Sequence, residues 1–108
     1  MVQKFRYQIF LPIINDSIIN ISSGAGKTGY SSLSTYCATK FGVRGFTKAL
    51  SNELENIKVI NVNPGMTATQ MTNFKGVPAR EVADVIFRTA TGKISVDNGG
   101  DVDVWDYV

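Results

Sequence analysis

The pattern of hydrophobic and polar positions predicts a strand, a loop and a long helix in the middle of the chain. Ser17 to Ser22 is rich in isoleucine and follows a turn-forming Asn-Asp pair, which is typical of a buried strand in a parallel sheet. Residues 23–32 are rich in Gly, Ser and Thr and are predicted to form a loop. Beyond Ser32 or Ser34, either of which can cap a helix, the chain runs to about Glu55 without proline and with apolar residues at helical spacing.

The flanking segments continue this alternation. A first helix is predicted from about Gln3 to Ile14, a strand over Lys58 to Val62, and another helix from about Ala79 to Thr91. Gly92-Lys93-Ile94 is predicted to lead into a last strand, or into a hairpin that turns at Asn98-Gly99-Gly100. The order of these elements predicts an α/β protein with a parallel sheet.

Composition and charge exclude several classes of protein. At 108 residues the chain holds one domain at most, and its 44% apolar content describes a soluble globular chain. The net charge of +2 has no concentrated basic patch, so nucleic-acid binding is not expected. No apolar run approaches the roughly eighteen residues that span a bilayer, and Met1 to Arg6 does not lead into a secretion signal. No membrane association is therefore expected.

The cysteine and histidine counts narrow the candidate chemistry. The chain has no histidine and a single cysteine, Cys37, so neither a metal site of the ordinary type nor a histidine-based triad is expected. A lone cysteine fits the reducing cytoplasm, and within a helix it is expected to behave as a small buried apolar residue.

The strongest candidate for chemistry is the pair Tyr36 and Lys40, at the start of the predicted long helix. Residues at i and i+4 share a helix face with Cβ atoms about 5–6 Å apart, so the Lys40 ammonium can act on the phenol of Tyr36. Ser23 lies thirteen residues upstream of Tyr36, directly after the predicted first strand. Taken alone, Tyr36 and Lys40 would be better explained as an ordinary amphipathic pair on a helix surface.

Further motifs give this pair its context, and together they resemble the short-chain dehydrogenase/reductase superfamily. The matching stretches are Asn20-Ile21-Ser22-Ser23-Gly24-Ala25-Gly26, Tyr36-Cys37-Ala38-Thr39-Lys40-Phe41-Gly42-Val43 and Asn63-Pro64-Gly65-Met66-Thr67-Ala68-Thr69. The resemblance covers nearly the whole chain and implies the C-terminal portion of a Rossmann-type doubly wound parallel sheet. The short stretch before Pro78 and the acidic, aromatic ending are most similar to small carbonyl-reductase-type members.

The resemblance also implies a reaction. A hydride would pass between NAD or NADP and the carbonyl or alcohol carbon of a small molecule. Tyr36 would donate or accept the proton, Ser23 would hold the substrate oxygen, and Lys40 would stabilise the phenolate. Tyr36 and Lys40 would also contact the cofactor, where Lys40 would bind the ribose hydroxyls of the nicotinamide nucleotide.

The third motif supplies the remaining cofactor contacts. Asn63-Pro64-Gly65 follows the predicted strand at its carboxyl end, where open α/β sheets bind ligands, and proline and glycine let the backbone pass close to a flat ring. By resemblance, Pro64, Gly65 and Thr67 line the nicotinamide, although the family more often has an aliphatic residue in place of Thr67. Thr69 would reach the carboxamide or the pyrophosphate. Alternatively, Pro64-Gly65 could be a common turn, and both threonines could cap a short helix.

Two parts of the family pattern do not occur in this sequence. No Gly-x-x-x-Gly-x-Gly follows an N-terminal strand, and the catalytic asparagine of the family would fall at or upstream of Met1. Residues 1–108 are therefore expected to be a single partial domain, the catalytic half of such an enzyme. The alternative is a truncated, inactive remnant or interaction module that retains the motifs.

A glycine-rich segment after the first strand is similar to a phosphate-binding P-loop. It is Gly24-Ala25-Gly26-Lys27-Thr28, but the first glycine of the P-loop pattern would fall at Ile21, which argues against an ATPase or GTPase.

The predicted long helix carries aromatic and small residues together, which would either face the sheet or pack against a second copy in a homo-oligomer. These residues are Phe41, Gly42, Gly45, Phe46 and Ala49.

Overall fold

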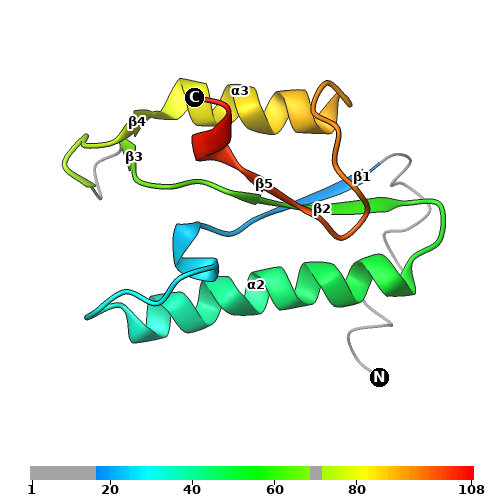
Figure 1. Cartoon of the computed structure of the whole chain (residues 1–108), viewed down its shortest axis with the longest axis horizontal. Coiled ribbons are helices and arrows are strands. Elements are labelled where there is room, and N and C mark those ends of the chain that lie inside the picture. Colours follow the sequence, from blue (N-terminus) through cyan, green and yellow to red (C-terminus); the bar gives the residue numbers. More distant parts are fainter. Residues whose placement is uncertain (1–16, 69–71) are drawn as a thin grey trace.

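A computed structural model describes residues 17–68 and 72–108 of the chain (Figure 1). The strands are β1 (Ser17–Ile21), β2 (Lys58–Asn63), β3 (Thr67–Ala68), β4 (Val77–Pro78) and β5 (Asp101–Asp103). The helices are α2 (Ser34–Glu53) and α3 (Ala79–Ala90), with short 3-10 turns η2 (Gly24–Gly26) and η4 (Val104–Asp106). The helix predicted at Gln3 to Ile14 and the candidate Thr69 lie outside the described residues.

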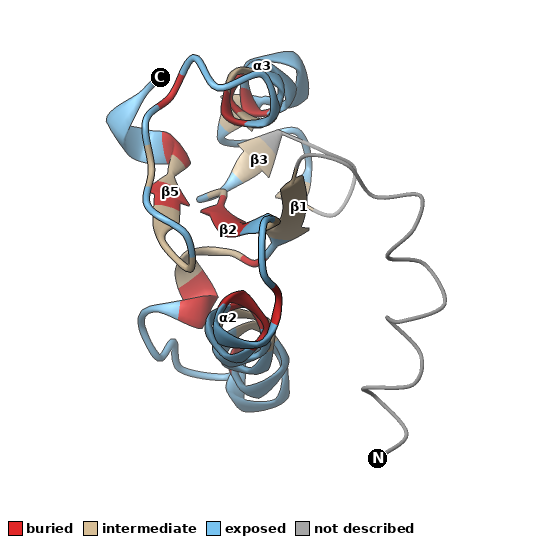
Figure 2. Cartoon of the chain, turned by 90° about the vertical axis from the view of Figure 1, so that its right-hand side faces the viewer, coloured by how far each residue is buried: buried red, intermediate tan, exposed pale blue. Residues whose placement is uncertain are grey.

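The main sheet is parallel, with strand order β1-β2-β5. Ser17 pairs with Lys58 and Ile21 with Val62, while Asn61 and Asn63 pair with Asp101 and Asp103 on the other side of β2. Helix α2 covers one face of this sheet and α3 the other (Figures 1 and 2). The prediction of a doubly wound α/β fold with parallel strands is confirmed.

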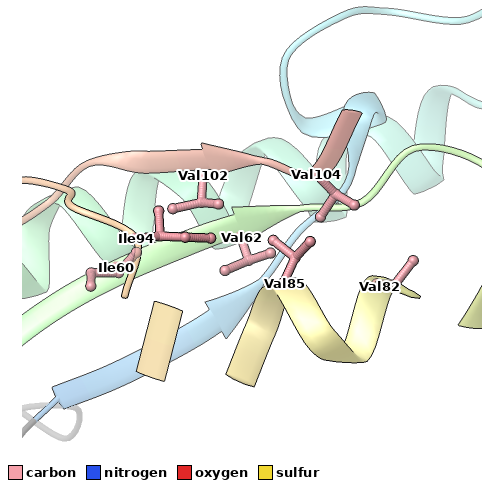
Figure 3. Close-up of a cluster of buried hydrophobic side chains, with 7 residues drawn as sticks. All are labelled: Ile60, Val62, Val82, Val85, Ile94, Val102 and Val104. Carbon is pink, nitrogen blue, oxygen red and sulfur yellow. The ribbon is translucent and has the colours of Figure 1, made fainter. Parts of the chain in front are cut away.

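Successive side chains of β2 point to opposite faces of the sheet, and they contribute to two hydrophobic clusters, one on each face. Ile60 and Val62 point toward α3 and belong to a cluster completed by Val82, Val85, Ile94, Val102 and Val104 (Figure 3). Val59 points toward α2 and packs with Leu50 and Leu54. Because both faces of β2 are buried, the carboxyl end of this strand is held in a fixed position relative to both helices.

The structure corrects three details of the predictions. β1 is only partly buried, because among the described residues it is the edge strand. Neither Ser32 nor Ser34 caps helix α2, because Ser32 adopts a left-handed φ of 67° and Ser34 is already helical. The N-cap residue is Leu33, which makes no side-chain cap. The last strand begins only at Asp101 and forms no hairpin, because it pairs parallel to β2.

The segment before β5 is held both by backbone hydrogen bonds to β2, from Gly99 N to Val59 O at 2.7 Å and from Asn61 N to Gly100 O at 3.0 Å, and by the side chain of Asn98. The side-chain oxygen of Asn98 accepts a hydrogen bond from Val59 N at 2.7 Å, and its side-chain nitrogen donates to Ser51 O at 3.0 Å. These bonds hold the turn at Asn98 and Gly99 against the end of α2 and the start of β2. The chain then enters β5 in the same direction as β2.

Helix α2 turns its aromatic and small residues away from the sheet. Phe41 and Phe46 are each 44% exposed, and a Cβ added to Gly42 or Gly45 would meet nothing within 4 Å. The face that packs on the sheet instead carries buried Cys37, Thr47, Leu50 and Ser51. The alternative in which the aromatic residues of α2 pack on the sheet is therefore wrong.

Among the described residues, neither α2 nor α3 combines the length and the apolar character that a membrane-spanning helix requires.

A polar network joins the middle of α2 to the sheet. Arg44 donates two hydrogen bonds to the carboxylate of Asp101, at 3.0 and 2.9 Å. Buried Asn61 and Asn63 donate to the same carboxylate at 3.0 and 3.1 Å. Burial raises the pKa of the Asp101 carboxyl, but hydrogen bonds from Arg44, Asn63 and Asn61 and the charge of Arg44 together hold it well below its usual range.

This network predicts an acid-sensitive contribution to stability. Since the folded-state pKa of Asp101 is depressed, its stabilisation is complete above the ordinary Asp value of about 4 and is lost as the pH falls below it. Asp101→Asn is expected to lower the free energy of unfolding by about 1–2 kcal/mol at neutral pH, because it weakens charge-assisted hydrogen bonds. In urea denaturation, the difference in the free energy of unfolding between wild type and variant should become smaller below about pH 4.

Asp84→Asn provides the control, because Asp84 forms an exposed pair with Arg88 on α3. That change should alter stability by less than about 0.5 kcal/mol. The role assigned to the carboxylate would be contradicted if the difference in the free energy of unfolding between wild type and Asp101→Asn stayed constant down to acid pH.

Candidate active site

The candidate site lies at the carboxyl edge of the parallel sheet, where the turns after β1 and β2 meet. Ser22 N donates to Val62 O at 2.9 Å, which extends the pairing of the two strands by one residue. Gly24 N then donates to Pro64 O at 2.8 Å. Through these backbone bonds, the turn that carries Ser23 is fixed beside the turn that carries Pro64 and Gly65.

A cavity of about 560 Å³ opens at this edge, within the range of small-molecule sites. Its lining includes five of the residues singled out in the sequence: Ser23, Tyr36, Pro64, Gly65 and Thr67. The remaining lining residues are Ser22, Gly24, Ala25, Tyr30, Leu33, Met66 and Thr72. The fold thus gathers candidates from the loop after β1, the start of α2 and the turn after β2.

Tyr36 and Lys40 lie in the first two turns of α2. The Lys40 ammonium is 5.7 Å from the centroid of the Tyr36 ring, within the range of a cation–π contact. Lys40 is not among the residues that line the cavity and is close to it only through this contact with the Tyr36 ring. No hydrogen bond to the Tyr36 hydroxyl is found among the described residues, and the side chain is 40% exposed. The phenol is therefore available to a bound ligand and lies close to a positive charge.

The two serines after β1 have different roles. The Ser23 hydroxyl oxygen accepts a hydrogen bond from Ala25 N at 2.8 Å, which caps η2 and fixes the position of the oxygen. Since a hydroxyl has one donor and two acceptor positions, Ser23 can still donate its proton to a ligand oxygen. Ser22 is buried, and its hydroxyl donates to Lys40 O at 2.8 Å. Ser22 thereby ties the loop to α2.

Gly26 and Arg44 complete the attachment of this loop, and nothing in the local sequence pattern indicates this role for either residue. A Cβ at Gly26 would collide with the Ser22 hydroxyl and would lie 2.9 Å from Lys40 O. Arg44 donates to Gly26 O at 3.0 Å while it holds Asp101. The loop can approach α2 this closely only because residue 26 has no side chain.

Gly26→Ala is expected to destabilise the fold by about 1–3 kcal/mol, the usual cost of overpacking. The added methyl group must displace either the Ser22 hydroxyl or the α2 backbone at Lys40. Gly29→Ala is the matched control in the same loop, because a Cβ at Gly29 would meet nothing within 4 Å. Urea denaturation of both variants checks this expectation, and equal stabilities would contradict it.

The turn after β2 can accept a flat ring. A Cβ at Gly65 would meet only Trp105, at 3.7 Å, so protein packing does not itself require glycine there. The absence of a side chain instead leaves open the surface of the cavity beside Pro64. The Thr67 hydroxyl turns back to Gly65 O at 3.3 Å, and Thr67 lies in β3 rather than capping a helix. The residues predicted to line a nicotinamide therefore fit one.

The P-loop resemblance has no structural counterpart. Gly24–Gly26 forms a 3-10 turn, and the Lys27 ammonium is paired with Asp103 at 2.7 Å. Within the described parts of the chain, no group of three or more His, Cys, Asp or Glu side chains could hold a metal ion.

Comparison with known proteins supports the family resemblance that the sequence motifs indicate. The family model described as short chain dehydrogenase matches residues 8–77. The 3-alpha-(or 20-beta)-hydroxysteroid dehydrogenase of Mycobacterium tuberculosis is 43% identical over 79 residues, which cover 71% of this chain and 28% of that enzyme. The NADPH-dependent pterin aldehyde reductase of Arabidopsis thaliana is 34% identical over 64 residues, or 58% of this chain and 26% of that protein.

The fold comparison extends further along the chain. The oxidoreductase yciK from E. coli superposes with a TM-score of 0.78 over 90% of this chain, at 23% sequence identity. The match covers 45% of the yciK chain. This chain therefore spans less than half the length of each of these three proteins.

Proposed function

The chain belongs to the short-chain dehydrogenase family, and from this we propose that it forms the catalytic half of an NAD(P)-dependent oxidoreductase. The reaction would be reduction of a carbonyl or oxidation of an alcohol. The observation that carries the proposal is the meeting of Ser23, Tyr36 and Pro64-Gly65 in one cavity at the carboxyl edge of the sheet. Carbonyl-reductase-type specificity is part of the same proposal.

In the direction of reduction, the substrate oxygen would lie between the hydroxyls of Ser23 and Tyr36. Ser23, whose oxygen is held by Ala25 N, would donate a hydrogen bond that fixes this oxygen in place. Tyr36 would transfer its proton to the oxygen as negative charge develops there. The neighbouring Lys40 ammonium would stabilise the phenolate that remains. A nicotinamide bound in the cavity supplies the hydride, or accepts it in the reverse direction.

The nicotinamide end of the cofactor would be held by residues of this chain. Pro64, Gly65 and Thr67 would line the ring, while Tyr36 and Lys40 would contact the ribose. Thr69, outside the described residues, would reach the carboxamide or the pyrophosphate. The relatives are roughly two to four times as long as the stretch they share with this chain. Residues 1–108 are accordingly proposed as one partial domain, with the adenine end bound elsewhere.

Two further elements belong to the proposal. The exposed face of α2 with Phe41 and Phe46 would pack against a second copy of the chain, because Gly42 and Gly45 leave room for a close approach. A cytoplasmic location would keep Cys37 as the free, buried thiol that the structure shows.

The function is tested by adding NADH or NADPH and a panel of ketones and aldehydes, and following loss of the reduced cofactor by absorbance. Carbonyl-dependent oxidation of either cofactor is the expected result. A folded preparation that reduces no carbonyl, alone or combined with a glycine-rich half from a relative, would favour the inactive remnant or interaction module.

A further inference from the structure

Large apolar side chains stand exposed around the two candidate catalytic hydroxyls. Tyr30, Leu33 and Met66 are 50%, 45% and 62% exposed, and all three line the cavity that contains Ser23 and Tyr36. The proton transfer described above uses none of them. Exposed apolar groups gathered around a reactive pair commonly mark the surface that receives an apolar ligand.

The same cavity offers no charged group to a substrate. None of its described lining residues carries a formal charge. The nearby Lys27 ammonium is neutralised by Asp103 at 2.7 Å, and Lys40 lies against the ring of Tyr36. A substrate carboxylate or phosphate placed here would lose its hydration without gaining an ionic partner, and this is strongly unfavourable.

The polar groups of the lining are also largely committed to the protein itself. The Ser22 hydroxyl is bonded to Lys40 O at 2.8 Å, and the Thr67 hydroxyl is directed to Gly65 O at 3.3 Å. The Thr72 hydroxyl donates within its own turn, with Thr67 O at 2.6 Å. Among the described lining side chains, the hydroxyls of Ser23, Tyr36 and Tyr30 remain able to bond a substrate, and the first two would hold the reacting oxygen.

We propose that the substrate is an uncharged, mainly apolar ketone or aldehyde, or the corresponding alcohol, whose apolar groups pack against Tyr30, Leu33 and Met66. This inference rests on the proposed function, because it assumes that the substrate oxygen lies at Ser23 and Tyr36. It names the substrate class of that same site and assigns Leu33 and Met66 as specificity-determining residues.

The experiment compares two ketones that differ by one charge, 4-phenyl-2-butanone and its para-carboxyl derivative. Wild-type protein is expected to reduce the neutral ketone with a kcat/KM at least about tenfold higher, because the carboxylate has no partner in the cavity. Met66→Lys and Leu33→Lys each place an ammonium in the lining and should shift the preference toward the carboxylated ketone. Phe87→Lys, on the exposed face of α3, is the matched control and should leave the preference unchanged.

The outcomes separate this inference from the proposed function. Equal or faster reduction of the carboxylated ketone by wild type would overturn the inference while leaving the oxidoreductase function in place. If neither ketone is reduced, saturation-transfer NMR of the two ketones decides the substrate class independently of turnover, while the carbonyl panel described above decides the proposed function. Binding of the neutral ketone that weakens in Leu33→Lys but persists in Phe87→Lys supports the inference. Tighter binding of the carboxylated ketone, or no binding of either, overturns it.

Discussion

Tyr36→Phe is expected to lower carbonyl reduction by about 10²–10⁴-fold, the usual contribution of a positioned general acid. The change removes one hydroxyl and keeps the ring that contacts Lys40. That hydroxyl makes no hydrogen bond to any described residue, so the fold should be unaffected. The measurement is the rate of carbonyl-dependent NADH and NADPH oxidation, with circular dichroism to establish that the variant is folded.

Tyr30→Phe is the matched control for this experiment. Tyr30 lines the same cavity and is also exposed, but it lies in the loop before α2 and makes no cation–π contact with any described lysine. Its rate should stay within a few-fold of wild type. Activity that survives Tyr36→Phe at the wild-type level would remove Tyr36 from the mechanism.

Lys40→Met is the second change with a large expected effect, because it removes the positive charge beside the phenol. Turnover should fall by about 10–100-fold, since the phenolate loses the charge that stabilises it as the proton leaves. Affinity for the reduced cofactor should fall as well, since the proposed contact with the ribose hydroxyls is lost. Steady-state kinetics gives kcat, and cofactor fluorescence gives the dissociation constant.

Two companion variants make the Lys40 result specific. Lys40→Arg keeps the charge and should restore part of the turnover. Lys48→Met removes a lysine two turns further along α2, which bonds Gly99 O and Asp101 outside the cavity, and should leave cofactor affinity unchanged. Equal loss of affinity in Lys48→Met and Lys40→Met would point to general destabilisation of α2 instead.

Local patterns in the sequence were sufficient to predict most of the elements that position the site. The apolar runs of β1 and β2 and the spacing along α2 follow from period and composition, and the structure places these elements within a few residues of the prediction. Ser23, Tyr36 and Gly65 were singled out by the three motifs that resemble the family, and each of them follows or begins a recognisable element. The parallel order of the sheet then brings them to a common edge.

What could not be predicted depends on contacts between distant parts of the chain. Asp101 lies 57 residues from Arg44, and nothing in its local sequence indicates a guanidinium partner. Asn61 and Asn63 alternate along β2 like ordinary strand residues until their hydrogen bonds to Asp101 are seen. Residue 26 similarly reads as one more loop glycine, because its contact with α2 exists only in the folded chain.

The exposed aromatic face of α2 illustrates the same limit. Phe41 and Phe46 are five positions apart, about 140° around the helix axis, so their spacing does not show which side of the helix faces the sheet. The direction was determined by Thr47 and Leu50, which pack on β1 and β2 from the opposite side of the helix.

Binding of a nicotinamide in the cavity at Ser23, Tyr36 and Gly65 can be tested by an NMR titration of the chain with reduced nicotinamide mononucleotide. This ligand carries only the nicotinamide end of the cofactor, so it does not need the glycine-rich half. We expect saturable shifts, at millimolar concentrations, of the backbone amides of Ser23, Tyr36, Gly65 and Thr67, and none with adenosine monophosphate. A folded chain whose cavity amides do not respond to this ligand, or respond equally to adenosine monophosphate, would contradict nicotinamide binding in this cavity.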